Sequence, residues 1–273
     1  MSLLRRRRHE RLYTRSVRRA LGTVPHYRER YLESGAGELP PLTRDEAELR
    51  RHLLMPLGAA LLPRRDPELD PSPGGPAAER VAELYEALCL AGRRPARGTE
   101  VYETGDALRD PVRAYGVTWR VRLSAAAETD PYAEPGRYAL PERPTGPPAL
   151  LVTDADTDAD TDTGAGTGSG TRSGPLTVLR LGLAIRATPR PAGSLWYEPW
   201  LGHLGAVPPS CGELHLNPAR VHARLLDGGT VLTMLRRRRP TLVHVRPEGG
   251  ELYRPATCPR HARPILRGVL DRP

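Results

Sequence analysis

The first stretch whose residue types could do chemistry is a bend rich in proline and glycine, Pro71-Ser72-Pro73-Gly74-Gly75-Pro76. It precedes residues 77–92, where apolar residues recur with helical spacing. Bare N–H groups and the positive end of a helix dipole at such a bend attract phosphate. However, the prolines donate no N–H and no lysine follows. We therefore expect Ser72, Gly74 and Gly75 to form either the phosphate end of a weakened nucleotide site or an ordinary turn before a helix.

Two Cys/His pairs in the C-terminal third have the residue types of a metal site. Cys211 and His215 are separated by three residues, and Cys258 and His261 by two. Together they could form a Cys₂His₂ zinc site, although the spacing differs from that of a zinc finger. His203 lies in the same region, so a Cys–His nucleophile built on Cys211 is a second interpretation. The third interpretation is that these are unrelated core and surface residues.

The segment 154–174 alternates aspartate with small residues and then becomes rich in glycine, threonine and serine. Alternating aspartates suggest calcium, but an EF-hand loop starting at Asp154 would lack its glycine and its final glutamate. The composition instead predicts a disordered insertion that cannot bury apolar surface. It divides the chain into residues 1–153, a helical N-terminal region and the start of an α/β lobe, and residues 175–273, the remainder of that lobe.

The composition restricts the partners and the compartment. The 273 residues carry a net charge of +9, and every one of the 41 basic residues is arginine. The arginine runs 5–8 and 236–239 are not interleaved with aromatic residues, which favours a solvated surface over a nucleic-acid partner. An odd number of scattered cysteines argues against a disulfide framework. Without a signal-peptide pattern or a long apolar run, the sequence predicts a cytoplasmic protein and no membrane partner.

Hydrophobic periodicity predicts helices and strands in alternation. Thr43 has the spacing of an N-cap, with Glu46 three residues later. The predicted helices cover residues 2–22, 25–31, 44–54, 77–92, 218–226 and 231–235. The predicted strands cover residues 99–104, 117–123, 150–152, 176–185 and 241–245, and residues 196–200 form a buried corner. This order favours an α/β fold with a mostly parallel sheet.

Several of these segments resemble the phenylacetate–CoA ligase family of adenylate-forming enzymes, which includes the coenzyme F390 synthetases. Residues 24–31 (VPHYRERY) resemble the family's VPFYRERY, and residues 39–46 (LPPLTRDE) resemble LPFLTKDD. The bend at 71–76 stands where the family has SSGTTGKP, and residues 83–95 resemble the helix that follows. Residues 231–243 are similar to LLRRLRPTVL, a helix and strand of the same lobe. The resemblance covers about half of the chain.

The resemblance implies a lobe that binds ATP and magnesium, activates a small carboxylic acid as an acyl-adenylate and transfers it to coenzyme A. This chain departs from that pattern, because the bend lacks the family's threonine pair and lysine and the sequence contains no lysine at all. Loss of these groups removes electrostatic stabilisation of the reacting phosphate. We therefore expect a degenerate ligase with weak or no catalysis, and the sequence identifies no catalytic residue. The alternatives are a non-catalytic accessory protein, one half of an enzyme completed by a complementary ligase fragment, or a basic protein associated with nucleic acid.

Overall fold

The computed structural model describes residues 3–35, 37–57, 76–104, 112–122, 149–154, 176–182, 190–198, 200–237 and 240–269. The helices are α1 (Leu3–Thr23), α2 (Pro25–Ser34), α3 (Arg44–Leu49) and α4 (Pro76–Leu90), with 3₁₀ helices η1 (Arg51–Leu54) and η4 (Gly250–Leu252). The strands are β1 (Glu100–Thr104), β2 (Val112–Ala114), β3 (Val117–Arg122), β4 (Ala149–Asp154), β5 (Leu176–Leu181), β6 (Leu195–Glu198), β7 (Gly202–Ala206), β8 (Leu214–Leu216), β9 (Val221–Leu226), β10 (Gly229–Met234), β11 (Tyr253–Thr257) and β12 (Pro264–Gly268).

In the described part of the chain, ten strands form one mixed sheet in the order β11-β12-β8-β7-β6-β5-β4-β1-β3-β2. Its centre is parallel, because β3, β1, β4, β5 and β6 pair in the same direction. The strands on both flanks pair antiparallel to their neighbours. The α/β class is therefore confirmed, with a mixed sheet whose central strands are parallel. Strands from both sides of the segment 154–174 join this sheet, since β4 pairs with β5.

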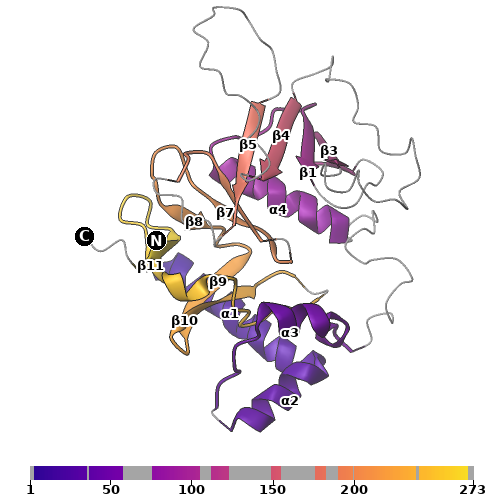
Figure 1. Cartoon of the computed structure of the whole chain (residues 1–273), viewed down its shortest axis with the longest axis vertical. Helices are drawn as coiled ribbons and strands as arrows, with labels where there is room; N and C mark the ends of the chain where they lie inside the picture. Colours follow the sequence, from indigo (N-terminus) through magenta and orange to yellow (C-terminus); the bar gives the residue numbers. More distant parts are fainter. Residues whose placement is uncertain are drawn as a thin grey trace, which may run out of the picture.

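Helix α4 lies across the strands on one face of the sheet, as Figure 1 shows, and packs most extensively against β7. The helical spacing of Val81, Leu84 and Leu88 places these side chains on one buried face. They share a core with Val101 of β1 and Val152 of β4. The helix predicted for residues 77–92 is thus confirmed, with bounds Pro76–Leu90.

The first three helices lie together at the opposite end of the molecule, beside β9 and β10 (Figure 1). Thr43 caps α3 as expected, because its hydroxyl accepts a hydrogen bond from the Glu46 N–H at 3.2 Å. The helix predicted over residues 44–54 breaks at Arg50 and continues as η1. Tyr27 joins α2 to the core, because its buried hydroxyl donates to the Thr241 carbonyl and accepts from the Val243 N–H.

The two helices predicted over residues 218–226 and 231–235 are wrong. The structure has an antiparallel hairpin there, with β9 pairing β10 from Val221↔Met234 to Leu226↔Gly229. Asp227 and Gly228 form its two-residue turn with φ of 47° and 73°, and Asp-Gly is a strong hairpin signal. The family-like helix of residues 231–243 is absent for the same reason. The apolar residues of this region fit the period of a strand in part and that of a helix in part. The pairing of β9 with β10 decides in favour of strands.

The remaining expected strands are confirmed in part. Strands β1, β3, β4 and β5 occupy the predicted segments, and β5 ends at Leu181. The strand predicted over residues 241–245 does not form: His244 has a left-handed φ of 53°, and only Val245 makes bridges, to Leu42 and Leu232. Residues 196–198 belong to β6, and Trp196 is buried as predicted. None of the helices in the described ranges combines the length and apolarity that crossing a membrane requires.

A row of aromatic rings attaches α1 to the β9–β10 hairpin. Tyr13 stacks on His222 with ring centroids 4.2 Å apart, and the ring centroids of His9 and His222 are 4.8 Å apart. The hydroxyl of Tyr13 also contacts His244 Nε2 at 2.8 Å and accepts from Arg224 at 2.6 Å. The hairpin and helix α1 therefore form one unit through buried imidazoles.

We expect this contact to weaken in mild acid. Burial lowers the pKa of His222 to about 4; His9 and Arg224 add to this effect and Glu10 opposes it. A histidine pKa below the unfolded value of 6.5 means that stability is full above pH 6.5 and declines as the pH falls towards 4.

The loss should be on the order of 3 kcal/mol, because each pKa unit corresponds to about 1.4 kcal/mol. Urea unfolding followed between pH 7 and pH 4 measures it. His222→Gln should flatten the decline, whereas His52→Gln, at an exposed histidine of η1, should leave it unchanged. Equal profiles for the two variants would contradict this account.

Candidate functional site

The four predicted metal ligands come together at the antiparallel flank of the sheet. Cys211 lies in the loop between β7 and β8, and His215 lies in β8 itself. Cys258 and His261 lie in the turn between β11 and β12. Strand β12 pairs with β8, with Ile265 opposite His215. This pairing unites two turns that are far apart in the sequence, so the four ligand atoms all lie within 4.8 Å of one another.

Three distances within this cluster are those of a tetrahedral zinc site, and the cluster as a whole is slightly wider, at up to 4.8 Å. The two sulfur atoms are 3.7 Å apart, and each sulfur lies 3.5 Å from an imidazole nitrogen of its own pair, His215 Nε2 or His261 Nδ1. Zinc bonds of about 2.3 Å to sulfur and about 2.0 Å to nitrogen imply roughly 3.8 Å between sulfurs and roughly 3.5 Å between sulfur and nitrogen. The separation of the sulfurs is too large for a disulfide, and both cysteines are free thiols.

The surroundings of the cluster suit a structural metal site. Cys211, Cys258 and His215 are buried, and both thiols pack against Ile265. Burial lowers the pKa of His215 to about 4, and His261 and Arg263 contribute in the same direction, so the imidazole is neutral and able to bind metal at neutral pH. His261 directs its other nitrogen, Nε2, to the Ser210 hydroxyl at 3.1 Å, as metal-binding histidines commonly do.

The same geometry disfavours the nucleophile interpretation of Cys211. Burial raises the pKa of its thiol, whereas a catalytic cysteine needs a lowered one. His203 does not join the Cys/His cluster, because its Nε2 lies 2.8 Å from Glu103 Oε1. The structure thus brings together Cys211, His215, Cys258 and His261 and separates His203 from them.

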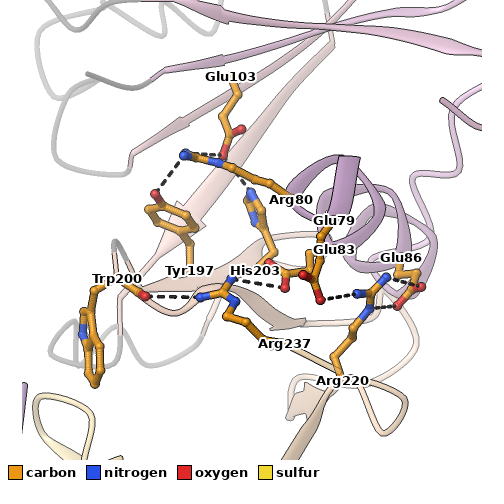
Figure 2. A network of polar contacts seen from close by, with 10 residues as sticks. All are labelled: Glu79, Arg80, Glu83, Glu86, Glu103, Tyr197, Trp200, His203, Arg220 and Arg237. Atoms are coloured by element: carbon orange, nitrogen blue, oxygen red, sulfur yellow. Dashed lines mark hydrogen bonds and ion pairs between the residues drawn. The ribbon is translucent and has the colours of Figure 1, made fainter. Parts of the chain in front are cut away.

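A second group of ionisable side chains, most of them buried, lies near the carboxyl ends of the parallel strands. Glu103 of β1 is fully buried, and Arg180 of β5 donates to its Oε1 at 3.0 Å. Arg80 of α4 lies 3.7 Å from the same oxygen and reaches the Tyr197 hydroxyl, as Figure 2 shows. Although burial acts to raise it, these cations and His203 hold the pKa of Glu103 well below its usual range. The carboxylate is therefore ionised and paired.

Two more acid–arginine pairs continue this group along α4 (Figure 2). Glu83, 1% exposed, accepts two bonds from Arg237 Nη2, at 2.9 and 3.2 Å. Burial raises the pKa of Glu83 to about 7, and Arg237 opposes this shift. One turn further on, Glu86 accepts from Arg220 Nε and Nη2 at 3.0 Å each. In the described residues, the acidic groups of this region are paired with arginines of the chain itself.

Sequence reasoning did not find this network. Glu103 is 77 residues from Arg180 and 100 residues from His203, so no local motif joins them. The available signal was that Glu103 and Arg180 each lie in a predicted strand. Parallel strands of one sheet end at the same edge, so residues near their carboxyl ends come close together. The proposed phosphate-binding residues Ser72, Gly74 and Gly75 lie outside the described residues, immediately before α4 begins at Pro76.

Comparison with protein-family models, with curated proteins and with solved structures found no match to this chain.

Proposed function

We propose that this chain is a degenerate adenylate-forming protein of the phenylacetate–CoA ligase type. It keeps the α/β lobe and activates carboxylic acids with ATP weakly or not at all. The order of elements supports this, because helices α1 to α3, then α4 and the parallel strands follow one another as the family-like motifs of the N-terminal half predict. In this proposal the chain acts as a binding or accessory protein.

The observation that carries the proposal is the closed ion network beside α4. A nucleotide site needs cations that can approach phosphate and carboxylates that can hold magnesium. Here Glu103 is enclosed by Arg180, Arg80 and His203, and Glu83 is enclosed by Arg237. Opening these pairs to bind a ligand would leave buried charges without partners, which costs several kcal/mol for each pair.

The Cys/His cluster has a structural role in this proposal, with zinc held by Cys211, His215, Cys258 and His261. All four ligand positions of a tetrahedral ion would be filled by the protein, which is typical of structural sites rather than catalytic ones. The ion would tie the β11–β12 turn to the β7–β8 loop and so hold the antiparallel flank of the sheet.

We expect the purified protein to show no ATP–pyrophosphate exchange above a blank without protein, with phenylacetate or benzoate and with coenzyme A present. Exchange requires formation of an acyl-adenylate, which the lysine-free chain is poorly equipped to stabilise. A calorimetric titration with Mg·ATP should likewise give no saturable heat. Robust exchange would overturn the degenerate interpretation, and exchange that appears only after a lid-domain fragment is added would identify one half of a split enzyme.

A further inference from the structure

A cavity of about 590 Å³ opens at the other end of α4, away from the bend. Its walls come from α1, the second half of α4, the loop 217–219, Arg236 and the turn 262–264. This volume falls within the range of small-molecule sites. The cavity shares Glu86 with the ion network, but its arginines lie outside that network, and it is adjacent to the turn that carries His261.

Three arginines give the cavity its charge. Arg8, Arg236 and Arg263 all line it, and all three side chains are exposed. Glu86 also lines it, but Arg220 holds that carboxylate with two hydrogen bonds of 3.0 Å. The three arginines outnumber this single carboxylate, so the described lining carries a net positive charge even though Arg236 also acts electrostatically on Glu86.

The rest of the cavity is largely apolar. Its lining includes Leu12 of α1, Leu90 and Tyr85 of α4, and Ala219. The ring of Tyr85 stacks on the ring of Tyr115, with ring centroids 4.7 Å apart and planes 10° apart, and this contact holds Tyr85 in position. Buried Asn217 supports the loop, because it donates to Glu86 at 2.7 Å and accepts from the Ala219 N–H at 3.1 Å. A flat apolar body therefore fits the interior while an anionic group meets the arginines.

We propose that this cavity binds a small phosphomonoester with an aromatic or other flat apolar body. Guanidinium groups recognise phosphate oxygens through paired, charge-assisted hydrogen bonds. A doubly charged phosphate uses a cluster of three arginines more fully than a single carboxylate does. The inference is independent of the proposed function, because the phosphate would be held by Arg8, Arg236 and Arg263, none of which belongs to the ion network.

Isothermal titration calorimetry of the full chain with phenyl phosphate tests the proposal. We expect saturable binding that is at least about tenfold tighter than that of inorganic phosphate or of phenol, because each lacks one of the two recognised parts. Phenylacetate has the same ring with a single negative charge and should bind about tenfold more weakly than phenyl phosphate. Tighter binding of phenylacetate would overturn the choice of phosphate, and absence of saturable binding of phenyl phosphate at millimolar concentration would overturn the site.

Substitutions of the lining residues test whether phenyl phosphate binds in this cavity. The double variant Arg236→Ala/Arg263→Ala should weaken phenyl phosphate by at least about tenfold. Arg28→Ala, at an exposed arginine of α2 outside the cavity, should leave the affinity unchanged. Ala219→Trp fills the cavity without changing the charge and should also abolish binding. If phenyl phosphate affinity survives Ala219→Trp, or if a polyanion such as RNA binds while phenyl phosphate does not, the arginines form a general anionic surface and the proposal is wrong.

Discussion

Replacing Cys258 with serine is expected to release a bound zinc ion and to lower the thermal stability of the protein. Wild-type protein should contain about one zinc ion per chain, because two thiols and two imidazoles converge within 4.8 Å and their sulfur–sulfur and sulfur–nitrogen contacts have the lengths that tetrahedral zinc requires. When the concentration of free zinc is about a thousand times the Kd of the site, binding stabilises the folded state by about 4 kcal/mol. Cys258→Ser should lose most of this contribution, as should wild-type protein treated with a strong chelator.

Zinc content by mass spectrometry and the unfolding midpoint measure the two effects in the same preparations. Cys89→Ser is the matched control, because Cys89 is a half-buried thiol of α4 outside the cluster. It should keep the zinc and most of the stability. A zinc content near zero in wild-type protein, or equal behaviour of the two variants, would contradict the metal centre.

Glu103→Gln is the second substitution with a large expected effect. The amide removes the negative charge that Arg180 and Arg80 share, and Arg180 is only 3% exposed. Breaking a buried ion pair by neutralising one partner costs about 3–5 kcal/mol, because the remaining charge loses its partner without regaining water. Urea unfolding should therefore show a loss of this size at neutral pH.

Glu100→Gln provides the comparison on the same strand. Glu100 pairs with Arg120 at 3.1 Å, but the two side chains are 24% and 42% exposed. Exposed pairs contribute about 1 kcal/mol at most, so this variant should be nearly as stable as the wild type. If Glu103→Gln and Glu100→Gln cost the same, the network is not a stabilising element. The double variant Glu103→Leu/Arg180→Leu should recover part of the loss, because it removes both charges together.

Local sequence patterns were sufficient for the helices of the N-terminal region, for α4 and for the parallel centre of the sheet. The apolar face of residues 77–92 predicted α4, and the Thr43 cap predicted the start of α3. These elements depend on hydrogen bonds and contacts between near neighbours, which the sequence displays directly. The pairs Cys211/His215 and Cys258/His261 were visible for the same reason, since each pair is local.

The hairpin of β9 and β10 shows where local patterns were insufficient. Residues 218–235 contain apolar residues compatible with a helix, but the Asp227-Gly228 turn and the contacts of α1 favour two paired strands. The strands gain partners from helix α1 and from residues 242–245 that an isolated segment does not have. Burial against distant residues therefore outweighed local propensity.

Residue types and short spacings indicated the α/β class, most helices and the four candidate metal ligands, because these follow from interactions within a few turns of chain. Tertiary structure decided that the two Cys/His pairs meet, through the pairing of β8 with β12. It also placed Glu103 among Arg180, Arg80 and His203. The physical reason is that strand order and packing bring together residues whose separation along the chain carries no information about their distance in space.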